Sequence, residues 1–174
     1  MASRQRTNLP RTNPLRTKLS RNLSDASRIA LVGIGSQFRG DDSCGLLVAE
    51  QLLKNPPKLP ASRKFKVFIG ATAPENLTGA IRKFKPDHVI LVDAADFKKK
   101  PGTSRLIGPG EAQGTCFCTH QLPLQIMADY IQQTMDAKVT IIGIQVKTLS
   151  FGNPLEKAVE KAALELASLI RTAV

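Results

Sequence analysis

Residues 28–35 read RIALVGIG, an apolar run that closes on two glycines. A short, continuous apolar run bounded by glycine is typical of a strand covered on both faces, as in a parallel sheet. The segment that follows, residues 43–54, places its leucines and alanines largely on one side of a helix. A buried strand followed by an amphipathic helix is the repeating unit of α/β folds.

The same alternation continues along the chain. Further strands are expected at residues 65–69 (FKVFI), 88–93 (HVILVD) and 139–145 (VTIIGIQ), with a short edge strand at 104–107. Helices are expected at 74–84, 122–135 and 154–172. Strands separated by helices pair in parallel through right-handed crossovers. The sequence therefore predicts a single α/β domain over residues 28–174, a three-layer sandwich with a mainly parallel, twisted sheet of about five strands and helices on both faces.

Residues 1–27 differ in composition from the rest of the chain. They contain six basic residues, one acidic residue and no aromatic residue, in a chain of 174 residues with a net charge of +11. We expect a basic, disordered tail whose removal leaves the melting temperature nearly unchanged, because it offers little to a core. An Arg-rich, Ser-rich and acid-poor start is also typical of organellar transit peptides. A further alternative is that translation truly begins at a codon further along the chain.

Composition also restricts the partners and the compartment. The chain has no Trp, one Tyr and no run of interleaved basic and aromatic residues, so no nucleic-acid partner is expected. Its apolar runs stop far short of the roughly 18–20 residues that span a bilayer, so no membrane insertion is expected. Three cysteines cannot build a disulfide framework, which favours the cytoplasm, although one disulfide plus one free thiol also fits.

Polar residues follow the predicted strands where each of them ends. Asp41 and Asp42 come after the first strand, Asp93 ends the third, and His120 precedes a helix. Ligands of parallel sheets bind beyond the carboxyl ends of the strands. Asp42, Asp93 and His120 are therefore predicted to gather at one sheet edge. Two carboxylates and an imidazole suit a borderline divalent metal, and they also suit acid and base catalysis.

Each of these residues also has a structural interpretation. Asp41 or Asp42 could cap the helix that follows, Asp93 could hold a turn, and His120 could simply start a helix. Convergence of three separate loops on one edge favours the functional interpretation. Cys116 and Cys118 alternate with His120 and could extend a metal site, or they could pack as small apolar groups.

A dinucleotide site is disfavoured. The glycines at 33, 35 and 40 are spaced GxGxxxxG, which misses the GxGxxG fingerprint by two residues. The aspartate pair also stands where a pyrophosphate would need the helix N-terminus.

Several segments together resemble the nickel–iron hydrogenase maturation endopeptidases, most closely the branch that processes hydrogenase-3-type and related archaeal enzymes. The segments that carry the resemblance span residues 28 to 158. They are Gly33-Ile34-Gly35-Ser36, Gly40-Asp41-Asp42-Ser43-Cys44-Gly45, Ala73-Pro74-Glu75-Asn76, Lys85-Pro86-Asp87-His88, Val92-Asp93-Ala94-Ala95-Asp96, Thr119-His120-Gln121-Leu122-Pro123-Leu124 and Gly143-Ile144-Gln145.

The resemblance implies an endopeptidase that removes a short C-terminal extension from the hydrogenase large-subunit precursor after nickel insertion. It implies that Asp42, Asp93 and His120 are the metal-binding and catalytic residues, that the nickel is carried by the substrate, and that Asp41 and Asp96 support the ligands. The protein is expected to be monomeric.

The sequence departs from the family pattern at two positions. Ile69 stands where relatives often carry Asp, and Val146 stands where Pro is common. If that Asp helps to sense nickel, its role is absent or moved in this chain.

The nucleophile is left open. No Ser-His-Asp, Cys-His or HExxH arrangement is visible, and the neighbouring aspartates disfavour a thiolate at Cys44. A metal-activated water is chemically reasonable. The alternative function is a non-catalytic, doubly wound module that binds a metal or a nucleotide. A third interpretation is RNA binding through the tail. It predicts an RNA affinity that falls steeply with salt concentration and disappears when residues 1–27 are deleted.

Overall fold

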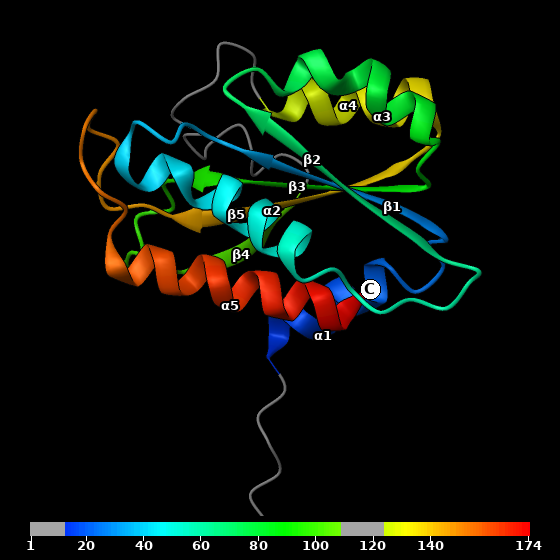
Figure 1. The fold of residues 1–174 in the computed structure, drawn as a ribbon, viewed down its shortest axis with the longest axis horizontal. Coiled ribbons are helices and arrows are strands. Elements are labelled where there is room, and N and C mark those ends of the chain that lie inside the picture. Colours follow the sequence, from blue (N-terminus) through cyan, green and yellow to red (C-terminus); the bar gives the residue numbers. More distant parts are fainter. Residues whose placement is uncertain (1–12, 109–123) are drawn as a thin grey trace, which may run out of the picture.

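The centre of the molecule is a five-stranded sheet with the strand order β2-β1-β3-β5-β4 (Figure 1). A computed structural model describes residues 13–108 and 124–174 of the chain. Strands β1 (Arg28–Ile34), β2 (Lys64–Ala71), β3 (His88–Ala95) and β5 (Lys138–Gln145) run parallel, and β4 (Ser104–Ile107) pairs antiparallel with β5. The short edge strand expected at residues 104–107 is thus confirmed.

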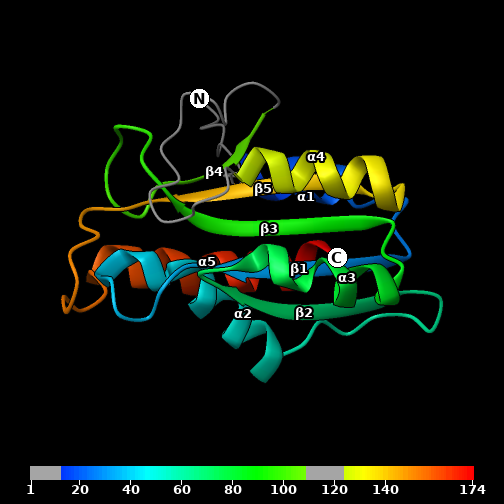
Figure 2. The same cartoon turned by 90° about the horizontal axis from the view of Figure 1, so that it is seen from above.

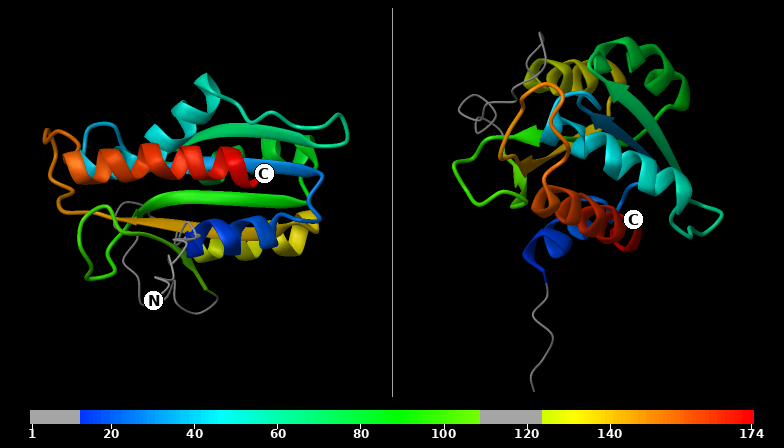
Figure 3. Two further views of the ribbon diagram at one scale, coloured as in Figure 1. Left: turned by 90° about the horizontal axis from the view of Figure 1, so that it is seen from below. Right: turned by 60° about the vertical axis from the view of Figure 1, so that its left-hand side comes forward.

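Helices cover both faces of the sheet, as the sequence predicts. On one face lie α1 (Pro14–Asn22), α2 (Cys44–Lys54) and α5 (Lys157–Ala173), which close one apolar core against the sheet. On the other face lie α3 (Thr78–Phe84) and α4 (Leu124–Met135), which close a second core. Figure 1 shows the sheet between these two helical layers, Figure 2 looks onto the layer that contains α4, and Figure 3 shows α1 and α5 side by side. The predicted three-layer α/β architecture is confirmed.

Strand burial follows the position of each strand in the sheet. Every residue of the central strand β3 is buried, which explains the apolar run Val89–Val92 between His88 and Asp93. The edge strand β2 instead alternates between exposed and buried positions, with lysines at 64 and 66 facing outward.

Two helix starts differ from the sequence-based expectation. The segment from Pro74 is a short 3-10 helix, η2 (Pro74–Leu77), before α3 begins at Thr78. The last helix begins at Lys157 rather than at Pro154, because the backbone of Glu156 is extended and its N–H donates to the Asp41 carboxylate at 2.8 Å. Periodicity alone does not reveal such a long-range bond.

The prediction of a disordered tail over residues 1–27 is wrong for the second half of that segment. Pro14–Asn22 form helix α1, and Asn13 caps it by accepting a hydrogen bond from the Leu15 N–H at 2.9 Å. Leu19 and Leu23 are fully buried in the core that α5 shares. The two leucines lie four residues apart, so one face of a helical turn carries both of them into the core.

Hydrogen bonds also tie the end of this segment to the body of the protein. The Arg63 guanidinium donates to the Leu23 and Ser24 carbonyl oxygens, and the Asp87 carboxylate accepts from the Ser27 N–H at 2.8 Å. Residues 13–27 therefore belong to the α/β domain. Residues 1–12 lie outside the described part of the chain.

A buried histidine lies beneath α1, at the amino end of β3. The His88 side chain is 2% exposed, and its Nε2 hydrogen-bonds the Thr140 hydroxyl at 2.8 Å. Burial lowers the pKa of His88 from 6.5 to about 4, and nearby Lys138 lowers it further against the opposing effect of Asp87. The imidazole is therefore neutral in the folded protein at neutral pH.

This histidine should make the protein acid-sensitive. Between pH 6.5 and about pH 4 the unfolded chain holds a proton on residue 88 that the folded chain does not, so stability falls as the pH drops through that window. The loss attributable to His88 should reach about 3 kcal/mol at pH 4 and level off within the next pH unit below it. Urea unfolding of the wild type and of His88→Gln, which retains an amide near Nε2, measures this loss. Parallel pH profiles of the two proteins would contradict it.

No described helix combines the length and apolar composition that a bilayer crossing requires.

Candidate functional site

The candidate site lies at the carboxyl ends of β1 and β3, the neighbouring strands at which the chain reverses its direction across the sheet. From β1 the chain moves outward to β2, and it then returns to the other side of β1 to form β3. This is the topological switch point, where parallel sheets leave a crevice between diverging loops.

Two glycines allow the helix after β1 to approach this crevice closely. A Cβ on Gly45, in the first turn of α2, would collide with the Ile34 and Val92 carbonyl oxygens at the ends of β1 and β3. Gly35 has φ +135°, and a Cβ there would collide with the Asp42 carbonyl oxygen. The absence of two side chains thus brings the short 3-10 helix η1 (Gly40–Ser43) against β3.

Asp42 and Asp93 are brought together by this packing. Both side chains are fully buried, Asp42 in η1 and Asp93 near the end of β3. Burial raises the pKa of the Cys44 thiol, and the charges of the nearby Asp93, Asp42 and Asp41 carboxylates raise it further. One oxygen of Asp93 accepts a hydrogen bond from the Ala94 N–H at 2.8 Å.

His120 lies outside the described residues, together with Cys116 and Cys118. Its predicted place beside the two aspartates is therefore untested. Within residues 13–108 and 124–174, no group of three or more His, Cys, Asp or Glu side chains is arranged to hold a metal ion.

Asp41 has a structural role that the sequence did not reveal. One carboxylate oxygen accepts from the backbone N–H groups of Lys147 and Thr148, at 2.6 and 3.1 Å, and the other accepts from Glu156 at 2.8 Å. Through these bonds the fully buried Asp41 joins the loop after β1 to the loop after β5. The N-cap interpretation of this acidic pair does not hold for Asp41.

Gln145 and Asp96 organise the loop after β3. The Gln145 side-chain oxygen accepts from the Phe97 N–H at 2.6 Å, and its amide nitrogen donates to Asp96 at 3.1 Å. Lys98 bonds Asp96 through its ammonium group and its backbone N–H, and these bonds, aided by Gln145, lower the pKa of Asp96 to about 2. Asp96 is therefore an anion that positions its loop, at the edge of the site.

The described residues near the two aspartates offer no activated nucleophile. Cys44 is buried, and its raised pKa keeps it a thiol at neutral pH. The Ser43 hydroxyl donates to the Gly40 carbonyl oxygen at 2.9 Å, and Ser36 accepts from the Phe38 N–H at 3.3 Å. No described base activates either hydroxyl.

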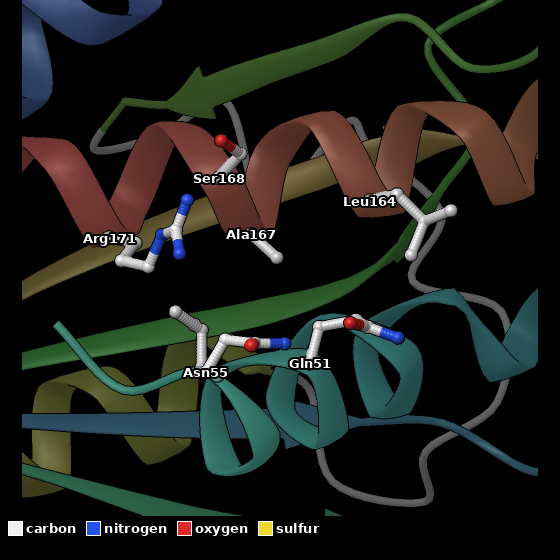
Figure 4. Close-up of a pocket in the computed structure, with 7 residues that line it drawn as sticks. Gln51, Asn55, Leu164, Ala167, Ser168 and Arg171 are labelled. Carbon is white, nitrogen blue, oxygen red and sulfur yellow. The ribbon is translucent and has the colours of Figure 1, made fainter.

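Two cavities differ in their relation to this site. One, of about 470 Å³, opens beside it and is lined by residues of the loops after β3 and β5, namely Asp96, Lys98, Lys99, Pro101, Gln145, Val146, Lys147, Thr148 and Leu149. The other, of about 250 Å³, lies between α2 and α5, where Gln51 and Asn55 face Ser168 and Arg171 (Figure 4). Only the first adjoins the carboxyl ends of the parallel strands.

A family model described as hydrogenase maturation protease matches residues 47–173, almost three quarters of the chain. The chain belongs to the hydrogenase maturation protease family. It is 32% identical over 133 residues to the hydrogenase 3 maturation protease of Escherichia coli, covering 76% of this chain and 81% of that protein.

Solved structures of relatives have the same fold. The crystal structure of the [NiFe] hydrogenase maturation protease HycI from Thermococcus kodakarensis matches with a TM-score of 0.78 and 34% identity, over 90% of this chain and 97% of that one. The solution structure of the endopeptidase HycI from Escherichia coli matches with a TM-score of 0.73 and 28% identity, over 83% and 90% of the two chains. The resemblance inferred from the sequence is confirmed, including its hydrogenase-3 branch.

Ile69, which stands where relatives often carry Asp, lies near the candidate site. Its side chain is 42% exposed at the end of β2, and its backbone pairs with Gly33 of β1. The position is therefore on the same sheet edge as Asp42 and Asp93. An aliphatic side chain there supplies no metal ligand.

Two aromatic residues at this edge were not singled out from the sequence. Phe38 and Phe151 stack with their ring centroids 6.3 Å apart, although they lie far apart in the chain. The pair would have been hard to find, because long-range bonds such as those of Asp41 bring the two loops together.

Proposed function

We propose that this protein is a cytoplasmic endopeptidase that removes a C-terminal extension from the large-subunit precursor of a nickel–iron hydrogenase after nickel insertion. The observation that carries the proposal is the buried pair Asp42 and Asp93 at the switch point of a hydrogenase maturation protease fold. Two carboxylates at this crevice stand where parallel sheets bind their ligands.

In this proposal the nickel belongs to the substrate. Asp42 and Asp93 supply carboxylate oxygens from two rigid elements, and His120 supplies the imidazole that completes the set. Carboxylate and imidazole donors suit a borderline divalent ion, and three protein ligands leave positions for groups that the substrate provides. The protease thereby recognises a precursor that already carries its metal.

A water molecule is the proposed nucleophile. The buried Cys44 thiol and the two backbone-bonded serines leave no activated protein group among the described residues. Asp42 and Asp93 would hold the scissile peptide and its nickel in position, and a carboxylate within hydrogen-bond reach would accept a proton from the attacking water.

The test is cleavage of matched precursors. Purified protease is incubated with nickel-loaded precursor and with the same precursor lacking nickel, and mass spectrometry identifies the released peptide. The loaded form should be cut at one bond, and the nickel-free form should be cut at least about a hundredfold more slowly, because the ligand set is then incomplete. Equal cleavage of both forms would reject recognition of nickel but leave the peptidase activity standing.

The alternative, a binding module without catalysis, predicts a different outcome. Such a module would bind the loaded precursor without releasing a peptide under any condition. The family assignment and the position of the aspartates favour the enzyme.

A further inference from the structure

The loops beside the site expose an aromatic pair. Phe151 is 79% exposed and Phe38 is 59% exposed, which makes them the two most exposed large apolar side chains of the described residues. Their rings stack at 6.3 Å with an interplanar angle of 29°. Exposed phenylalanine rings forgo the free energy of burial, so two stacked rings form an apolar patch suited to a binding partner.

The backbone around this pair is held in place. The Gly152 N–H donates to the Phe38 carbonyl oxygen at 2.8 Å, the Arg39 guanidinium donates to the Leu149 carbonyl oxygen at 3.3 Å, and the Asp41 N–H donates to Thr148 at 3.2 Å. Figures 1 and 2 show the two loops side by side beyond the carboxyl ends of the parallel strands. The patch is therefore presented on a preformed surface, which lowers the entropic cost of binding.

A cationic cavity adjoins the aromatic pair. The cavity of about 470 Å³ is lined by Lys98, Lys99 and Lys147, with Asp96 as its one acidic side chain among the described lining residues. Thr148 and Leu149 line it too, and they belong to the loop that carries Phe151. One loop thus contributes to both the cavity and the aromatic pair, and it is bonded to Asp41 beside Asp42.

We propose that Phe38, Phe151 and the lysines of this cavity form the docking surface for the precursor, which contributes an apolar side chain to the aromatic pair and neighbouring carboxylates to the lysines. This inference rests on the proposed function and adds the chemistry of substrate recognition. Continuity with the candidate site favours the substrate as occupant. Lys98 pairs with Asp96 and Lys147 pairs with Glu156 at 2.9 Å, so Lys99 supplies the net positive charge of the described lining, and in a chain of net charge +11 this favours an acidic segment.

The aromatic half is tested with the double variant Phe38→Ser/Phe151→Ser. Steady-state cleavage of nickel-loaded precursor should show KM raised about tenfold or more, with kcat within about twofold of wild type, because exposed anchors contribute to binding and not to chemistry. The matched control is Leu53→Ser/Leu164→Ser, whose side chains are 53% and 40% exposed on α2 and α5, and its KM should not change. Melting temperatures verify that both variants fold.

The cationic half is tested by reversing one charge. Lys99→Glu should raise KM several-fold at low salt and weaken the salt dependence of KM, whereas Lys161→Glu, on the exposed face of α5, should do neither. Lys161 is a suitable control because it lies beside Glu165 and away from the cavity.

The outcomes separate the docking surface from the function itself. If wild-type protein cuts the precursor and neither variant changes KM, the docking surface is wrong and the protease assignment stands. If wild-type protein cuts no nickel-loaded precursor, the proposed function is wrong, and the docking surface that rests on it falls with it. If light scattering shows a dimer that Phe38→Ser/Phe151→Ser dissociates, the aromatic pair binds a second copy of the chain, and the precursor is not its occupant.

Discussion

Asp93→Asn should reduce cleavage of the nickel-loaded precursor by at least about a hundredfold. Losing a group that merely supports a metal ligand typically costs 10- to 100-fold, so losing Asp93, which is a ligand in the proposed function, should cost no less. Asparagine fills the same volume in this fully buried position, and its carbonyl oxygen can still accept from the Ala94 N–H. The rate constant is obtained by following peptide release by mass spectrometry under saturating precursor.

Asp96→Asn is the matched control for this substitution. It makes the same chemical change three residues further along the chain, but its side chain bonds Lys98 and Gln145 at the edge of the site. Activity should fall by less than about tenfold, because Asp96 positions a loop and holds no substrate group. Full activity of folded Asp93→Asn would remove Asp93 from the mechanism.

Leu23→Ala should destabilise the protein by about 2–5 kcal/mol, although residue 23 lies in the segment that composition marks as a tail. The side chain is fully buried in the core shared with α5, and removing such a leucine costs its burial energy plus a cavity. For a chain of this size, each kcal/mol lowers the melting temperature by roughly 2–4 °C. Thermal unfolding followed by circular dichroism measures the effect.

Arg16→Ala tests whether the whole helix or only its buried face matters. Arg16 is exposed on α1, so its replacement should shift stability by less than about 0.5 kcal/mol. Deleting residues 13–27 should be at least as damaging as Leu23→Ala, since it removes Leu19 as well. A deletion variant with wild-type stability would show that α1 contributes nothing to the domain.

The sequence predicted the layers of the fold because each strand and helix carries its own local pattern. The central strand at 88–95 has an apolar run at 89–92, and the helix at 44–54 has a one-sided pattern. Helix α1 was missed because its few apolar residues are diluted by arginine, serine and asparagine. Its stability comes from packing on α5, and a tertiary contact of this kind has no local signature.

The site was predicted in part for a related reason. The order of the strands brings Asp42 and Asp93 to one edge, and a rule of topology was enough to predict this. The bonds of Asp41 to residues 147, 148 and 156 join loops more than a hundred residues apart, so no pattern within a single segment encodes them. The same long-range joining brings Phe38 and Phe151 together.

The close fit of Gly45 against two strand ends has a consequence for tracing this activity through distant sequences. Because its α-hydrogen faces the Ile34 and Val92 carbonyl oxygens, any larger residue would push the start of α2 away from the sheet. The aspartate carried by the preceding turn would move with it, away from the aspartate on β3. A sequence that keeps both aspartates but replaces this glycine therefore keeps the two carboxylates and loses their spacing. Genome surveys that identify such enzymes by their acidic residues alone should require the glycine too.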